Sequence, residues 1–311
     1  MKKTILSIVA ICSMLLNANA QKVSAFEHLD FSITAGTTGI GFDLATPISE
    51  KFRLRAGFSF VPEFDTKMNF GIQGRKMDDN GNWVTTKFDS MADRFSDFTG
   101  ITINDNVDMI GQPNFYNGNL LVDFFPIKNS DFYITAGFYF GKSKIASACN
   151  SIEDMASLLG VSMYNRIYEK VENYEPIIGD DIYLTPELEQ KILDNGRLGI
   201  HMGDKVATGE PYMMEPDENS TVKANIFVNS FKPYLGVGYG GKLTKKNDAL
   251  RISFDAGMLF WGGTPEIVTH DGTDLAKDVE NIGGKVGDYV SLVESLKVYP
   301  VLKLSISYRI F

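Results

Sequence analysis

The sequence is poor in cysteine and histidine. Only two cysteines and three histidines occur in 311 residues. Cys12 lies in an N-terminal apolar run, so Cys149 is left without an intramolecular partner if that run is removed. His28, His201 and His270 show no spacing typical of a metal site or a catalytic triad. We therefore expect no disulfide scaffold, no metal or other cofactor, and no enzyme.

Long apolar runs and excess positive charge are also missing. After the N-terminal run, no segment approaches the roughly 20 apolar residues that a membrane-spanning helix needs. The 30 Lys and Arg residues are outnumbered by 39 Asp and Glu, which gives a net charge of -9. Nucleic acid requires clustered positive charge, so it is not an expected partner. Any contact with a membrane interior must then be made by strands.

The first 20 residues, "MKKTILSIVAICSMLLNANA", have the pattern of a secretory signal peptide. Lys2 and Lys3 give a basic start, residues 5–16 are apolar, and a small-x-small motif follows at 18–20. The mature chain is predicted to start at Gln21. Cys12 is predicted to leave with the signal, and residues 21–311 to form one domain.

Alternation of apolar and polar side chains is the main signal in the mature chain. Glycine (29 residues) and aromatic residues (12%) are plentiful, as tight turns and strands require. In "KFRLRAGFSF", "DFYITAGFYFG" and "LRISFDAGMLFW", every second side chain is apolar. Together with weaker segments, the pattern predicts eight strands, at about 26–36, 38–46, 51–62, 114–126, 131–146, 229–244, 249–262 and 297–311.

The connections between these strands alternate in length. "TPISEK", "PIKNSD" and "TKKNDA" are short turns, whereas residues 63–113, 147–228 and 263–296 form long connections. Outer-membrane barrels have short periplasmic turns and long external loops. The predicted fold is therefore all-β: an eight-stranded antiparallel transmembrane up-and-down barrel with long extracellular loops. At "GTTG" a hairpin gives eight strands and a glycine bulge gives seven; we favour the hairpin.

Some local structure is predicted within the long connections. "GRKMDDNGNWVTT" is typical of a hairpin with its tip at Asn80-Gly81. "TPELEQKIL" predicts a short helix capped by Thr185, and residues 274–297 predict a helix broken at Gly283-Gly284. Residues 147–228 suggest a folded cap over the barrel mouth, in which "MASLLGVSMY" is interpreted as packing rather than as a partner site.

The polar faces of the strands predict a charged lumen. An eight-stranded barrel is filled by its own side chains, so these charges are expected to meet and pair. We favour a salt-bridged core over a narrow gated pore. Gly236, Gly238 and Gly240 leave local space in which a small passage is conceivable. The predicted lumen charge network is Asp43, Arg53, Arg55, Asp123, Arg251, Asp255, Lys303 and Arg309.

Four segments resemble the small bacterial outer-membrane barrel proteins of the OmpA and OmpW type: "GTTGIGFDLATPISEKFRLRAGFSF", "DFFPIKNSDFYITAGFYFG", "KPYLGVGYGG" and "YPVLKLSISYRIF". The resemblance covers about half of the chain and leaves the long connections unmatched. It implies a final strand that the barrel-assembly machinery reads, with Tyr308, Ile310 and Phe311 as the assembly signal. Phe311 departs from the family pattern, since it falls one residue beyond the alternation.

The sequence thus predicts a monomer in a bacterial outer membrane with its loops facing the cell exterior. We expect a structural or surface-binding role carried by those loops. The alternative is a narrow, porin-like channel for ions or small solutes. The expected partners are outer-membrane lipid, the barrel-assembly machinery and an extracellular ligand or surface partner. A membrane-embedded hydrolase would need an acid-base pair or nucleophile at the rim, and no spacing indicates one.

Overall fold

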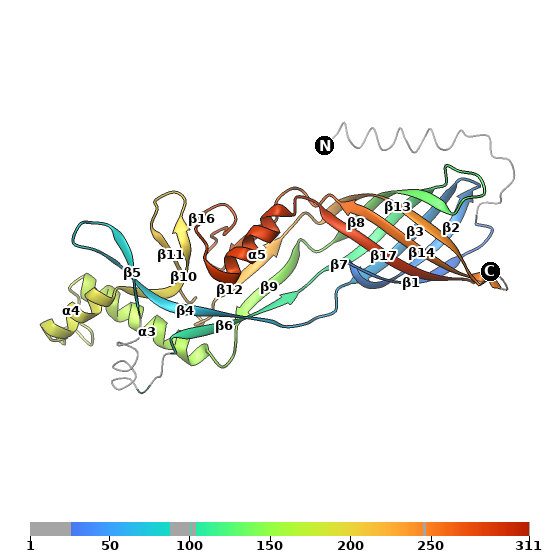
Figure 1. Cartoon of the computed structure of the whole chain (residues 1–311). Helices are drawn as coiled ribbons and strands as arrows, with labels where there is room; N and C mark the ends of the chain where they lie inside the picture. Colours follow the sequence, from blue (N-terminus) through green and yellow to red (C-terminus); the bar gives the residue numbers. More distant parts are fainter. Residues whose placement is uncertain (1–25, 88–99, 101–103, 245–246, 311) are drawn as a thin grey trace.

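The molecule is elongated, with a barrel at one end and a second sheet at the other (Figure 1). The computed structural model describes residues 26–87, 100, 104–244 and 247–310. The predicted signal peptide with Cys12, the predicted start at Gln21, and Phe311 lie outside these residues.

Eight antiparallel strands close into a barrel in the order β1-β17-β14-β13-β8-β7-β3-β2. Each lies within or close to one of the eight segments that the alternation predicts, so the predicted fold class is confirmed. The strands are β1 Asp30–Gly36, β2 Gly39–Ser49, β3 Phe52–Phe60, β7 Tyr116–Phe124, β8 Phe132–Gly141, β13 Phe231–Thr244, β14 Asn247–Leu259 and β17 Tyr299–Arg309.

A tight hairpin joins β1 to β2, which confirms the count of eight strands over seven. Gly36 pairs with Gly39 across the turn. Gly39 has φ +92°, in the left-handed region that favours glycine. A Cβ at this position would overlap the carbonyl oxygen of Phe60, so a side chain is also excluded by space.

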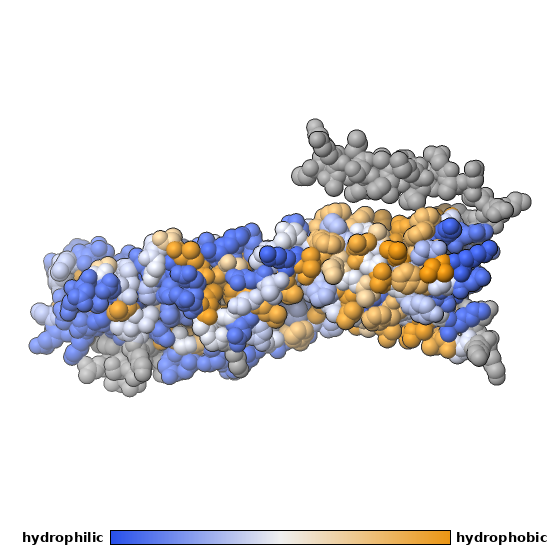
Figure 2. Space-filling model, turned by 45° about the horizontal axis from the view of Figure 1, so that its top comes forward, coloured by the Kyte–Doolittle hydropathy of each residue, from blue (hydrophilic) through white to orange (hydrophobic). Residues whose placement is uncertain are grey.

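The barrel is apolar outside and polar inside. Ile33 is 65% exposed while its neighbour Thr34 is 3% exposed, and Leu304 is 46% exposed beside Lys303 at 3%. On β13 the parity is reversed as predicted, since Leu235 faces outward and Gly236 inward. Figure 2 shows the resulting hydrophobic surface gathered over the barrel, with hydrophilic surface at the opposite end of the molecule.

The three long connections fold together into a second structure, which we call the head. Nine of its described strands form one sheet, and three helices accompany them. Within the described residues, no helix has the length and apolar character needed to span a membrane. The strands are β4 Thr66–Met77, β5 Trp83–Lys87, β6 Asn106–Pro113, β9 Lys144–Asn150, β10 Arg197–Lys205, β11 Pro211–Met214, β12 Lys223–Phe227, β15 Glu266–Thr269 and β16 Val279–Glu280. The helices are α3 Met155–Glu172, α4 Pro186–Asn195 and α5 Gly284–Ser295.

The head is a continuation of the barrel wall. The barrel strands β3, β7, β8, β13 and β14 are joined through short segments to β4, β6, β9, β12 and β15. Both sets keep the same lateral order in their sheets. Only β1, β2 and β17 have no such extension, and α5 directly precedes β17. Figure 1 shows α5 lying beside the head strands near the barrel.

Two local predictions in the head are confirmed. Met77 pairs with Trp83 in a hairpin whose tip contains Gly81, at φ +81°. Helix α4 begins at Pro186 with Thr185 as its N-cap residue, although the Thr185 side chain makes no capping hydrogen bond.

The predicted helix over residues 274–297 is wrong in its first half. Only α5 is helical, because Val279 and Glu280 pair with β10 instead. The carboxylate of Asp274 accepts hydrogen bonds from the backbone N–H groups of Ile267 and Ala276, which fixes a turn.

Helix α3 packs on the head sheet. Its Leu158, Val161 and Tyr164 are buried in one cluster with Leu198 and Met214 from the sheet. This spacing places the three side chains on one helix face. The interpretation of "MASLLGVSMY" as packing is therefore confirmed.

Candidate functional site

Arg55 forms the centre of the lumen charge network. Alternation along β3 turns its side chain inward, where it is 4% exposed. Its Nη2 lies 2.8 Å from Oδ1 of Asp123 and 2.8 Å from Oδ1 of Asp255. Arg53 Nε donates to Oδ2 of Asp123 at 2.8 Å. The four side chains come from strands β3, β7 and β14, so the network ties separate parts of the barrel wall together.

A second buried pair joins β17 to β2. Lys303 Nζ lies 2.7 Å from Oδ2 of Asp43, and Asn119 donates to Oδ1 of the same carboxylate at 3.1 Å. Thr135 donates to Oδ1 of Asp123 at 2.8 Å. Buried charges are tolerated when they are paired and hydrogen-bonded, and both conditions hold here.

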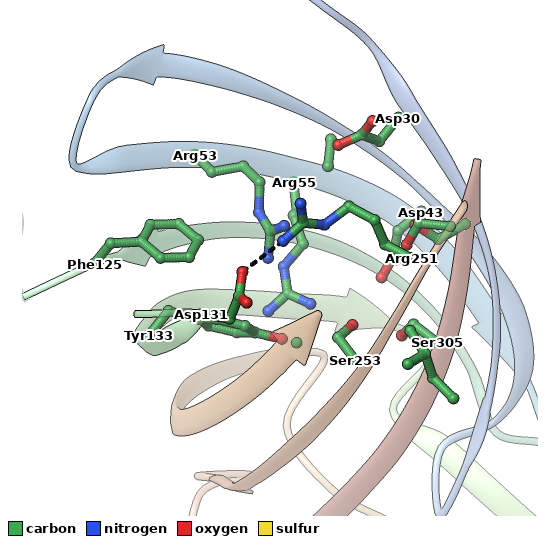
Figure 3. A pocket seen from close by; sticks show the side chains of 15 residues that line it. Asp30, Asp43, Arg53, Arg55, Phe125, Asp131, Tyr133, Arg251, Ser253 and Ser305 are labelled. Atoms are coloured by element: carbon green, nitrogen blue, oxygen red, sulfur yellow. Dashed lines mark hydrogen bonds and ion pairs between the residues drawn. The ribbon is translucent and has the colours of Figure 1, made fainter. Parts of the chain in front are cut away.

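The other two predicted network residues pair with partners that were not predicted. Arg251 Nη2 lies 2.6 Å from Asp131 Oδ1, as the dashed line in Figure 3 marks. Arg309 Nε lies 3.6 Å from Oδ1 of Asp30. Asp30 follows the inward parity of β1 and could have been found by alternation. Asp131 lies just before β8, in a turn where alternation gives no facing.

The space between these charges is small. A pocket of about 20 Å³ lies among the side chains drawn in Figure 3. This volume holds about one water molecule. The described charges thus line a nearly filled interior.

Apolar side chains fill the lumen at its head end. We call this cluster the plug: Phe115, Leu121, Tyr139, Tyr234, Leu259 and Val301 are all buried together. The charge network around Arg55 and Lys303 therefore occupies one part of the lumen, and the plug lies between that network and the head.

The expected space beside the β13 glycines is occupied. A Cβ on Gly238 would overlap ring atoms of Tyr133, and one on Gly236 would overlap the hydroxyl of Tyr234. The idea of a passage is therefore wrong beside Gly236 and Gly238, because tyrosine rings take the volume that the missing side chains leave. Gly240 lines only the pocket of about 20 Å³.

Lys232 is a further buried charge, at the head end of β13, which the sequence reasoning missed. It is fully buried, its Nζ donates to Asn117 Oδ1 at 3.1 Å, and it lies 5.7 Å from the centroid of the Phe115 ring. Within the described residues no acidic side chain pairs with it. The signal in the sequence that could have identified it is the parity of β13, which turns Lys232 to the same side as Gly236 and Gly238.

The described residues contain no cluster of three or more His, Cys, Asp or Glu side chains that could hold a metal ion. His28 Nε2 lies 3.6 Å from Asp30 Oδ2 at the start of β1. His201 belongs to β10, and His270 follows β15 in the head. The structure therefore does not bring the three histidines together.

The predicted assembly signal lies on the outer face of β17 as far as it is described. Tyr308 and Ile310 are exposed on the same side as Leu304. The remaining member, Phe311, lies outside the described residues.

Comparison with known proteins does not assign the chain to a family. No protein-family model matches the chain, and no curated protein matches it. Two crystal structures of proteins from Acinetobacter baumannii are similar. CarO2 has 14% sequence identity and a TM-score of 0.37, and the match covers 91% of this chain and 98% of CarO2. CarO has 13% sequence identity and a TM-score of 0.37, and the match covers 90% of this chain and 97% of CarO. The identity and the TM-score are both low, and the resemblance to the OmpA and OmpW type stays a prediction.

Proposed function

We propose that the protein is an outer-membrane anchor that displays the head at the bacterial cell surface for binding. The observation that carries this proposal is the inverted pattern of the barrel. Exposed apolar side chains alternate with buried polar ones on its strands. Such a surface is unfavourable in water but suits a bilayer, where a closed barrel also satisfies every strand edge.

The lengths of the connections support an orientation with the head outside. The tight turns after β2, β7 and β13 lie at one end of the barrel, and the head extends from the other (Figure 1). In outer-membrane barrels the short turns are periplasmic. The proposal therefore includes a secretory signal peptide, recognition of the last strand by the barrel-assembly machinery, and a monomer in contact with outer-membrane lipid.

The filled lumen favours an anchor over a channel. Ions passing through would have to displace both the paired charges around Arg55 and the apolar plug. Conduction requires a continuous polar path, and an apolar constriction opposes ion passage by excluding water. The channel remains the alternative, and conductance separates the two.

The test has two arms. In planar bilayers, the purified full-length protein is expected to give no stepwise conductance, and Arg53→Ala is expected to give none either. On intact cells, a membrane-impermeant thiol reagent is expected to label Lys67→Cys, an exposed position of the head, in a Cys149→Ala background. Stepwise conductance that differs between the unaltered protein and Arg53→Ala would favour the channel. A head cysteine labelled only after the cells are opened would overturn surface display.

A further inference from the structure

The head contains an apolar cavity that is separate from the barrel lumen. Its volume is about 300 Å³, and it lies between the strands of the head sheet and α5. Ligand pockets begin at about this size. Its lining combines methionine, alanine, valine, isoleucine and phenylalanine side chains with few polar groups.

The strand register explains why the sheet and helix leave space between them. Thr66 pairs with Gly111, Gly111 with Ala148, and Ala148 with Ala224, which places one small residue on each of four neighbouring strands. All four line the cavity. With strands about 4.8 Å apart, this row makes a floor roughly 14 Å long that runs across the sheet.

Larger side chains close the slot around this floor. Met68 and Met109 pair on the next position of β4 and β6, and they line the cavity on that side. The opposite wall is the face of α5 that carries Val286, Val290 and Val293. The result is an apolar space bounded by the sheet on one side and by α5 on the other.

Two exposed aromatic residues mark an entrance. Phe64 and Tyr289 both line the cavity, and both are about half exposed. Phe64 lies between β3 and β4, where the head joins the barrel. An apolar molecule therefore has a route into the slot near the base of the head.

We propose that this cavity binds the hydrocarbon chain of a free single-chain acyl compound, such as a long-chain fatty acid. An elongated apolar slot matches one flexible chain better than a compact polar solute, and its volume is too small for a two-chain lipid. Apolar cavities exclude water and accept apolar molecules, and empty ones cost stability in proportion to their volume. This proposal rests on the proposed function, since a head displayed at the cell surface would take the acyl compound from outside the cell.

The test is photo-crosslinking of the full-length protein in phospholipid nanodiscs with a diazirine derivative of palmitic acid. Adducts are expected on peptides from β6, β9, β12 and α5, and excess unlabelled palmitate should reduce them at least tenfold. Labelling of the barrel surface by the bilayer pool should not be competed in this way. A diazirine phospholipid should leave the head peptides unlabelled.

Filling the floor provides the matched variants. A Cβ on Gly111 meets nothing closer than 3.6 Å, so Gly111→Leu is expected to fold and to project into the slot. It should lose at least tenfold of the head adducts, as should Ala224→Phe. Asn225→Leu alters the next residue of β12, which faces the other side of the strand, and should keep them. Palmitate should also raise the melting temperature of the unaltered protein but not of Gly111→Leu.

Absence of competed adducts on the head, or equal labelling of Gly111→Leu, would overturn the proposal, as would head labelling by the phospholipid. These results are independent of surface display. If the thiol reagent labels the head on intact cells but the head binds no fatty acid, the anchor function stands and the fatty-acid proposal fails. If palmitate competes for head adducts but the reagent does not reach the head on intact cells, the fatty-acid proposal stands and surface display fails.

Discussion

Gly238 and Tyr133 lie directly opposite each other on β13 and β8, and the tyrosine ring covers the glycine. The same ring lies 5.0 Å from the guanidinium of Arg53 and 5.5 Å from that of Arg55. A glycine on one strand therefore makes room for an aromatic ring that in turn packs on the central charges. This contact connects the packing of the lumen to its electrostatics.

Gly238→Ala is expected to destabilise the barrel by about 1–3 kcal/mol, because the new methyl group would overlap the Tyr133 ring. The measurement is denaturant unfolding of the folded protein in detergent. Gly241→Ala is the matched control on the same strand, since its Cβ would meet nothing closer than 3.7 Å. Equal stability of the two variants would contradict the packing described here.

Arg55→Ala is expected to lower the free energy of unfolding by about 3–5 kcal/mol, because Asp123 and Asp255 would remain buried without the Arg55 guanidinium. Arg251→Ala removes an arginine whose partner, Asp131, has a side chain about half exposed, and it should cost less than about 1 kcal/mol. The temperature at which the folded band is lost in gel electrophoresis ranks the two variants. Similar losses would mean that Arg55 is not the centre of the network.

Lys232→Met is expected to stabilise the protein by about 1 kcal/mol or more. The substitution removes a buried charge that lacks an acidic partner and keeps a long side chain beside Phe115. Lys128→Met, in an exposed turn, should change the unfolding free energy little. If Lys232→Met lowers stability instead, the ammonium group has a role in the lumen beyond filling space.

The loop before β12 is expected to depend on pH through Asp217. Burial alone would raise the pKa of this carboxyl group, but hydrogen bonds from the N–H and hydroxyl of Thr221 and from the N–H of Asn219 outweigh it and lower the pKa to about 2. Because the folded-state pKa lies below the unfolded value near 3.9, the stabilisation is present above about pH 4 and is lost as the pH falls toward 2.

Amide hydrogen exchange of residues 217–223 checks this prediction. Protection of these amides relative to unfolded peptide rates should fall between about pH 4 and pH 2 in the unaltered protein. Asp217→Asn should remove most of that change. A protection pattern that is independent of pH in both proteins would contradict the assignment.

The barrel could be predicted from the sequence because its signal is local and repeated. One face of each strand is apolar, so alternation gives both the strands and the facing of residues such as Arg55 and Asp123. The turn residue Asp131 could not be assigned a facing, and the space beside Gly238 could not be seen to be filled by Tyr133, because both depend on the register between strands.

Apart from the hairpin of β4 and β5, the head sheet was not predicted, since most of its strands are short and pair across long stretches of chain. Arg75 of β4 pairs with Arg197 of β10, far along the chain. Strand β4 alternates between exposed and more buried residues, but β10 does not, so alternation alone did not reveal their sheet. Val279 favoured a helix by local pattern but joins β10 in the folded protein. The small residues at Gly111, Ala148 and Ala224 become a cavity floor only through that pairing.

Depth-resolved spin labelling measures whether the outer face of the barrel contacts lipid. In a Cys149→Ala background, nitroxide labels on Leu304→Cys and Lys67→Cys are compared in bilayers for their collision rates with oxygen and with a water-soluble nickel chelate. Since Leu304 faces lipid and Lys67 faces water, the label at position 304 is expected to meet mainly oxygen and the label at position 67 mainly the chelate. A label at position 304 that meets the chelate as readily as the one at position 67 would contradict lipid contact.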